Sequence, residues 1–177
     1  MEINNRKLIK IEQKDIHDET IDIPSYIWYI ESFAFAGIKG LKQVIIPDNI
    51  RRIKRYAFRD CIDLQTIVIE AHDCKLDGNA FAYCLNLREI NLPRNLKRIH
   101  SCTFYNCPNL SDIILPDQLE SIGTWAFFGC KSLQKIIIPN TVNYIREQYF
   151  INCVNLSEIY FHNHIYTYDD LFEYNRF

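Results

Sequence analysis

The sequence lacks the short motifs that carry the common enzyme chemistries. No H-E-x-x-H, G-x-S-x-G or C-x-x-C motif occurs, and the glycine pattern of a phosphate-binding loop is missing. His100 and Cys102 stand close together, but residues two apart in sequence say little about hydrogen-bond geometry. We therefore expect a protein that is not an enzyme, with no catalytic residues and no cofactor.

The histidines are few and do not form a metal-binding pattern. They are His17, His72, His100, His162 and His164. His162 and His164 lie near Asp169 and Asp170, yet an H-x-H pair without further fixed ligands falls short of a zinc spacing. We expect no bound metal.

Long hydrophobic runs and flexible linkers are also missing. No stretch reaches transmembrane length, and the first residues, MEINNRKLIKIEQKDIHDET, are charged throughout rather than built like a signal peptide. We expect a cytoplasmic protein, with export by a non-classical route left open. Because no Gly/Ser-rich or proline-rich linker interrupts the 177 residues, we expect a single folded domain.

What the sequence does contain is one repeat unit of 23 residues, which recurs without insertions. The repeat begins with a leucine, at Leu41, Leu64, Leu87, Leu110, Leu133 and Leu156. Apolar residues follow three places later, at Val44, Ile67, Ile90, Ile113, Ile136 and Ile159, and five places later, at Ile46, Ile69, Leu92, Leu115, Ile138 and Phe161. Each unit ends with a phenylalanine, at Phe58, Phe81, Phe104, Phe127 and Phe150, and a cysteine, at Cys61, Cys84, Cys107, Cys130 and Cys153. A fixed period of this length is typical of a solenoid.

Each unit predicts one strand and one return, by which we mean the segment that leads the chain back to the start of the next strand. The alternation after the leucine indicates a strand with one buried face. Proline then follows at Pro47, Pro93, Pro116 and Pro139, with Glu70 as the exception, and ends the pairing because it has no N–H to donate. The rest of the unit, such as SIGTWAFFGC, is short, so we expect a tight turn with a short helical or 3₁₀ segment.

Residues 87–132, "LREINLPRNLKRIHSCTFYNCPN" and "LSDIILPDQLESIGTWAFFGCKS", resemble the BspA-type leucine-rich repeats. Units of that family read L-x-x-I-x-L-P-x-x-L-x-x-I-x-x-x-A-F-x-x-C-x-x, and the resemblance covers residues 18 to about 162. It implies an α/β repeat solenoid, a leucine-rich-repeat horseshoe of 23-residue units with a parallel concave sheet and short helical or 3₁₀ returns. It also implies a non-catalytic module that binds other proteins.

The expected boundaries follow from the repeat. Residues 1–17 form an N-terminal cap, 18–162 the solenoid, and 163–177 a C-terminal cap. The solenoid comprises six units, at 18–40, 41–63, 64–86, 87–109, 110–132 and 133–155, plus a partial seventh. The C-terminal segment carries Tyr166, Tyr168, Leu171, Phe172, Tyr174 and Phe177. We expect it to cover the last unit as a short amphipathic helix, and weak self-association through it is the alternative. The oligomeric state is left open.

The cysteines at the repeat position are expected to be buried, reduced thiols that behave as small apolar residues. Cys74 and Cys102 stand outside this column, and their exposure is left open. A further column just before the Ala-Phe pair contains Phe33, Tyr56, Asn79, Cys102, Trp125 and Gln148. Outward-facing Trp125 and Tyr56 would add a contact on the convex side, but large aromatics beside a phenylalanine ladder more often complete the core, which is the interpretation that we favour.

The side chains between the inward-facing aliphatics must point outward onto the concave side of the sheet, which we call the strand face. The central row is Ile45, Val68, Asn91, Ile114, Ile137 and Tyr160. It is edged by Gln43, Thr66, Glu89, Asp112, Lys135 and Glu158. An apolar stripe with a polar rim is typical of a protein interface, with Tyr160 as the expected anchor. The competing interpretation is that β-branched residues simply suit strands.

A second exposed group, the basic edge, follows the proline turns of the first half. It consists of Arg51, Arg52, Lys54, Arg55, Lys75, Lys97 and Arg98. The alternative function is therefore binding of an acidic ligand, nucleic acid or a sulfated glycan. The formal net charge of −2 makes nucleic acid the less favoured partner, and exposed basic residues also simply solubilise a turn.

Overall fold

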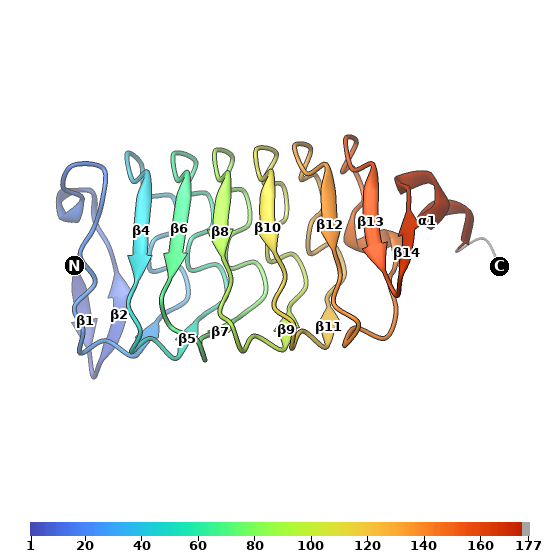
Figure 1. Ribbon diagram of the computed structural model, residues 1–177. Coiled ribbons are helices and arrows are strands. Elements are labelled where there is room, and N and C mark those ends of the chain that lie inside the picture. Colours follow the sequence, from blue (N-terminus) through green and yellow to red (C-terminus); the bar gives the residue numbers. More distant parts are fainter. Residues whose placement is uncertain (175–177) are drawn as a thin grey trace.

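The computed structural model describes residues 1–174, and it is a parallel β-solenoid of about seven turns. One side of the solenoid is a row of parallel strands standing side by side (Figure 1). These are β4 (Gln43–Ile46), β6 (Thr66–Ile69), β8 (Glu89–Asn91), β10 (Asp112–Ile114), β12 (Lys135–Ile137) and β13 (Glu158–Phe161). Paired strands are in register at the 23-residue spacing from β4 to β10 and again from β12 to β13, as in the pairing of Ile67 with Ile90. The leucine-rich-repeat solenoid is therefore confirmed.

A second side of the solenoid carries two-residue strands in the units up to residue 132. They are β3 (Tyr29–Ile30), β5 (Arg52–Ile53), β7 (Lys75–Leu76), β9 (Arg98–Ile99) and β11 (Ser121–Ile122). The pairs β3–β5, β5–β7 and β9–β11 are parallel. The third side is a turn that contains the Ala-Phe pair, and it also bonds from unit to unit, as where the Phe58 N–H donates to the Ala80 carbonyl at 2.8 Å.

Helical returns of the expected short kind occur, but they are only a minor part of the structure. Among the returns of the described chain, a 3₁₀ helix occurs at η2 (Glu147–Tyr149), and a further one, η1 (Gln13–Asp15), precedes the first unit. The reason is a column of residues with positive φ in the returns before η2, at Phe33, Tyr56, Asn79, Cys102 and Trp125, with φ between 58° and 63°. A left-handed residue ends any right-handed helical run, so the chain turns instead.

The core is a stack of identical layers. Phe35, Phe58, Phe81, Phe104, Phe127 and Phe150 are fully buried. Their rings stack with centroids 4.3 to 5.7 Å apart. Stacked rings bury large apolar areas in each layer, so every unit is stabilised by its neighbours rather than by itself.

The repeat cysteines link each layer to the one before. The Sγ of Cys84 donates to the carbonyl of Phe58 at 3.1 Å, and Cys107 bonds Phe81 in the same way at 3.1 Å. All seven cysteines are free thiols. Burial raises the pKa of Cys61, Cys107 and Cys153 to about 12. Cys74 is buried, whereas Cys102 is half-buried and desolvation raises its pKa.

Glu70, which replaces the repeat proline, makes a backbone hydrogen bond that is lost in the units with proline. Its N–H donates to the Ile46 carbonyl at 2.9 Å, a bond that proline cannot make. Where Pro93 follows the next strand, the side-chain amide of Asn91 instead bonds both the N–H and the carbonyl of Ile69, at 2.6 and 2.9 Å. The irregular third unit, residues 64–86, is therefore bonded to the unit before it through the Glu70 backbone and to the unit after it through the Asn91 side chain.

Both ends carry extra antiparallel strands. At the N-terminus, β1 (Glu2–Asn4) and β2 (Lys7–Lys10) form a hairpin, and β2 continues the second side by pairing with β3. At the C-terminus, β14 (His164–Tyr166) folds back on β13, and α1 (Tyr168–Tyr174) follows with Leu171 buried. The expected aromatic surface on the C-terminal segment extends to Phe177, which lies outside the described residues, as do the side chains of Phe172 and Tyr174. No helix in residues 1–174 has the length and apolar character needed to cross a bilayer.

Candidate functional site

The strand face is the outward side of the β4–β13 row, and none of its twelve predicted residues is buried. Its central row is strongly apolar and exposed: Ile45 is 47%, Ile114 87% and Ile137 60% accessible. Val68 and Tyr160 are half-buried. An isoleucine as exposed as Ile114 contributes little to the core, so the fold does not require an apolar residue there.

Asn91 has a structural task that the sequence did not reveal. Its amide is held by the Ile69 backbone, as described above. Its polar atoms are therefore already used within the sheet, and the apolar row is divided at this point into a pair before it and a group after it.

The row continues beyond the residues that the repeat identified. In the hairpin of β13 and β14, Tyr160 pairs with Ile165, so the two side chains lie on the same side of the sheet. Ile165 is 60% exposed. The sequence signal for this strand is the alternation on both sides of His162 and Asn163, which is typical of a β-hairpin. The structure places these two residues in a two-residue turn, both with positive φ.

The polar rim is partly engaged at the C-terminal end. The Lys135 ammonium lies 3.9 Å from the Glu158 carboxylate and 4.4 Å from the ring centroid of Tyr160. The Tyr160 hydroxyl also donates to Glu158 at 2.9 Å. Tyr160, the expected anchor, is thus held in an internal cluster, which leaves Ile114 and Ile137 as the most exposed apolar side chains of the predicted row.

The sheet is interrupted between β10 and β12, and we call this interruption the seam. Parallel ladders join β4, β6, β8 and β10, and a separate ladder joins β12 to β13 and β14; in the described chain no ladder joins β10 to β12. The core side reflects the same break. Ile113 is half-buried, whereas its counterparts Ile90 and Ile136 are buried.

Two hollows flank Ile114. One of about 730 Å³ lies at the seam, lined by Ile114 of β10, by Leu115 directly after that strand, and by Ile137 of β12. The other, of about 620 Å³, lies between β8 and β10 and is lined by Glu89, Arg94 and Ile114 among others. Volumes of this size, within the ~300–1,000 Å³ typical of binding sites, can accept side chains of a partner.

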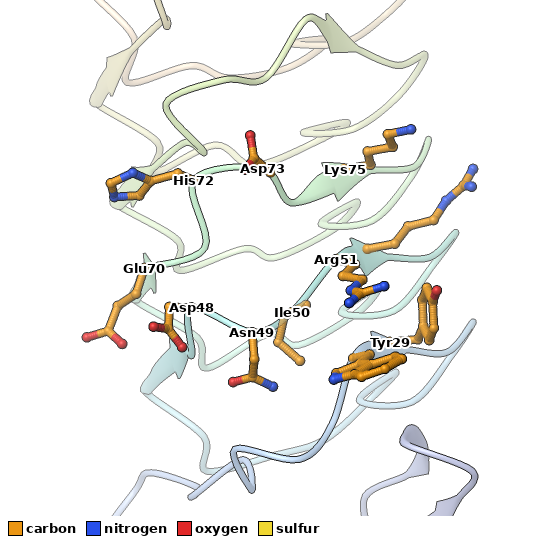
Figure 2. A pocket seen from close by; sticks show the side chains of 11 residues that line it. Tyr29, Asp48, Asn49, Ile50, Arg51, Glu70, His72, Asp73 and Lys75 are labelled. Carbon is orange, nitrogen blue, oxygen red and sulfur yellow. The ribbon is translucent and has the colours of Figure 1, made fainter.

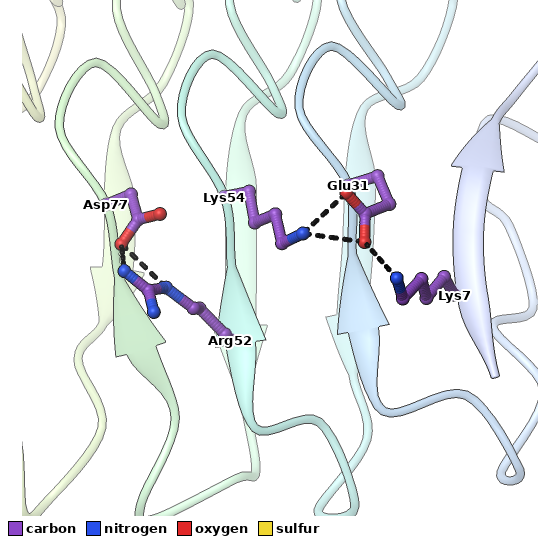
Figure 3. Close-up of polar contacts among 5 residues, drawn as sticks. All are labelled: Lys7, Glu31, Arg52, Lys54 and Asp77. Carbon is purple, nitrogen blue, oxygen red and sulfur yellow. Dashed lines mark hydrogen bonds and ion pairs between the residues drawn. The ribbon is translucent and has the colours of Figure 1, made fainter. Parts of the chain in front are cut away.

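The basic edge lies along the second side of the solenoid, and its charges are largely paired within the chain. Arg52 contacts Asp77 at 2.8 Å, and Lys54 contacts Glu31 at 2.7 Å, a carboxylate that also faces Lys7 (Figure 3). Hydrogen bonding to Asp77 raises the pKa of Arg52. These pairs join neighbouring units and reduce the positive field available to an anionic ligand.

Other cations of the basic edge pair with carboxylates or aromatic rings. Lys97 contacts Glu120 at 2.8 Å, and this contact lowers the pKa of Glu120. Arg51 and Arg6 lie on the Trp28 ring, with their guanidinium carbons 4.1 and 4.0 Å from its centroid.

Arg55 lies 5.7 Å from the Tyr56 ring centroid. Lys75 and Arg98 make no ion pair within the described residues.

A hollow of about 880 Å³ opens beside this edge. Figure 2 shows Asp48 and Glu70 at one end, and Arg51 and Lys75 at the other, with His72 also in its lining. Charges of both signs therefore line it, which does not favour a polyanion.

The aromatics of the column before the Ala-Phe pair do not complete the core, which corrects the expectation. Phe33 is 55% and Trp125 46% exposed. Phe33 stacks on the half-buried Tyr56 with centroids 5.0 Å apart. The positive φ of the column turns these side chains outward from the adjoining, inward-facing phenylalanines.

The candidate metal residues remain separate. His162 bonds through Nε2 with the Val142 carbonyl at 3.1 Å, and Asp170 accepts bonds from Thr167, which lower its pKa. Within residues 1–174, no three His, Cys, Asp or Glu side chains gather closely enough to hold a metal ion.

Comparison with known proteins agrees with the repeat columns. The model of the BspA type leucine rich repeat region matches residues 14–101 and 74–176, in six copies. A leucine-rich repeat protein from Bacteroides ovatus is 31% identical over 78% of this chain, with a TM-score of 0.72. One from T. pallidum is 29% identical over 82% of this chain and 69% of its own, with a TM-score of 0.76. No curated protein sequence matches the chain significantly.

A leucine rich cell surface protein from Faecalibacterium prausnitzii is 29% identical over 68% of this chain, with a TM-score of 0.64. The chain spans about a third of the length of the B. ovatus and F. prausnitzii proteins, 36% and 32% respectively. The family model covers nearly all of the sequence, and the structure repeats the same layers of leucine, phenylalanine and cysteine. This chain belongs to the BspA-type leucine-rich-repeat family.

Proposed function

We propose that this protein is a non-catalytic scaffold that binds another protein through its strand face. The observation that carries the proposal is the exposed apolar row, above all Ile114 and Ile137 beside the seam. The exposed apolar residues that follow Asn91, edged by charged side chains, have the anatomy of a protein interface.

The scaffold is preformed, which supports the same proposal. Strands, turns and buried phenylalanine layers fix the outward side chains from unit to unit. Binding to a rigid surface costs little conformational entropy, so a modest apolar contact yields useful affinity. The alternative, an acidic ligand on the basic edge, has less support because Arg52, Lys54 and Lys97 already face carboxylates.

The test is capture of partner proteins from native extract by the immobilised chain. Ile114→Asp/Ile137→Asp places two charges in the apolar row, and we expect it to reduce capture by at least about tenfold. Leu85→Asp/Val154→Asp is the matched control, because both residues are exposed, at 37% and 65%, and directly follow the repeat cysteines, away from the strand face. Circular dichroism must show both variants folded.

The same experiment separates the two surfaces. Lys75→Gln/Arg98→Gln removes two cations of the basic edge that have no ion pair in the described chain. If this variant or high salt abolishes capture while Ile114→Asp/Ile137→Asp retains it, the acidic-ligand function replaces the proposed one. Loss with the strand-face variant alone supports protein binding at the strand face.

A further inference from the structure

The seam combines three features that do not coincide elsewhere in the β4–β13 row. The ladder stops between β10 and β12, the core residue Ile113 is half-buried, and the outward residue Ile114 is the most exposed large apolar side chain described. The hollow of about 730 Å³ lies between these two strands. A partner side chain that entered it would contact Ile114, Leu115 and Ile137 together.

The interruption also leaves backbone groups free of ladder partners. In a parallel sheet each strand bonds its neighbour on both sides, so the edges of β10 and β12 that face the seam lack that bonding. β10 and β12 nevertheless remain neighbours in the row, and the rings of Phe104 and Phe127 stay stacked between the same two units, with centroids 5.5 Å apart. A further strand does not fit between them, so a partner reaches the hollow with a side chain from the strand face.

The charges around the hollows are mainly negative. Asp112 and Asp117 line the seam hollow, and Glu89 lines the neighbouring one with Asp112 and Asp117. None of these carboxylates has an ion pair within residues 1–174; Asp112 accepts a hydrogen bond from the Ser111 hydroxyl at 2.7 Å.

Two cations face the same space. Lys135 is already engaged with Glu158 and Tyr160, which leaves its charge partly neutralised. Arg94 lines the hollow on the β8 side and does not line the seam hollow. Three carboxylates against one unpaired guanidinium make the surroundings of Ile114 complementary to positive charge.

We propose that the seam binds a segment of a partner protein in which an apolar side chain is flanked by lysine or arginine. The apolar side chain occupies the hollow between Ile114 and Ile137, and the basic side chains face Asp112 and Asp117. This inference rests on the proposed function, because it names the chemistry that the strand face recognises.

The test uses a library of random short peptides displayed on phage and selected on the immobilised full chain. Peptides that also bind Ile114→Asp/Ile137→Asp are removed. We expect the remaining sequences to share an apolar residue with lysine or arginine within two positions. Enrichment of acidic flanks, absence of charge preference, or failure to enrich any peptide would overturn the inference.

A matched pair of variants then locates the charge effect. Asp112→Asn/Asp117→Asn should weaken the enriched peptides about three- to tenfold, as expected for two exposed ion pairs. Asp48→Asn/Glu70→Gln removes the same charge near the ends of β4 and β6 and should leave binding unchanged. Equal weakening by both pairs would show a general effect of net charge and contradict a local site.

Failure of this inference can be distinguished from failure of the proposed function. If Ile114→Asp/Ile137→Asp loses captured proteins from extract but the peptides show no basic preference, protein binding stands and the partner chemistry is wrong. If the double variant captures the same proteins as the wild type, the proposed function itself fails.

Discussion

Ile136 and Ile137 are neighbours in β12 with the same side chain, yet they face opposite sides of the sheet. Ile136 is 1% accessible and packs in the core, whereas Ile137 is 60% accessible on the strand face. The inward column is aliphatic in every unit because each layer must fill the same space. The outward row varies from isoleucine to asparagine to tyrosine, so packing of the core does not fix its residue types.

The largest expected difference in the free energy of unfolding is between a buried and an exposed phenylalanine. Phe104→Ala removes a fully buried ring stacked between two others, and we expect it to lower the free energy of unfolding by about 3–5 kcal/mol. Phe33→Ala removes an exposed ring and should cost far less. Urea unfolding followed by circular dichroism measures both; equal losses would contradict the layered core.

The two isoleucines of β12 sharpen the comparison at a single strand. Ile136→Ala should destabilise the protein by about 2–5 kcal/mol through lost burial and a cavity. Ile137→Ala should cost less than about 1 kcal/mol, mainly through strand propensity, while weakening partner binding. Denaturation and capture assays on the same samples test this separation, and it fails if stability and binding change together in both variants.

The interior thiols predict a loss of stability at high pH. Buried Cys107 stays protonated until about pH 12, whereas the same thiol in the unfolded chain ionises near its ordinary value of 9.0. Its stabilising effect is therefore complete below pH 9 and declines as pH rises toward 12, by up to about 1.4 kcal/mol per pH unit.

Cys107→Ala should make the fall in unfolding free energy above pH 9 shallower, as measured by denaturant titrations under reducing conditions. Cys102→Ala is the control, because this half-buried thiol lies outside the repeat column and should alter the slope less. Identical slopes for both variants and the wild type would show that the thiols do not set the pH dependence.

The smallest effect is expected on the basic edge. Lys97→Gln breaks an ion pair with Glu120 in which both side chains are about half exposed. We expect no measurable change in melting temperature or in capture. A clear loss of captured protein would move recognition from the strand face toward this edge.

Much of the fold was predictable because the 23-residue period fixes which residues repeat in each layer. The alternation of Asp112, Ile113 and Ile114 also gives the direction of each side chain on a strand. These inferences need only local geometry and a period.

Other features depend on contacts between units, which a period does not contain. The outward turn of Trp125 follows from its positive φ, a conformation that no sequence pattern for tryptophan indicates. The pairing of Lys54 with Glu31 joins residues 23 apart across two units, and the missing ladder between β10 and β12 does not follow from the repeat, which continues through both strands. Ile165 lies on the strand face because of the β13–β14 hairpin, which is not part of the 23-residue repeat.

The most direct test of the central claim is photocrosslinking from single positions. A benzophenone amino acid replaces Ile114 on the strand face or, as a control, Leu85 in the loop after Cys84. Binding through the strand face predicts a crosslinked partner from position 114 and none from position 85. Crosslinking of the same partner from position 85, with none from position 114, would contradict recognition through the strand face.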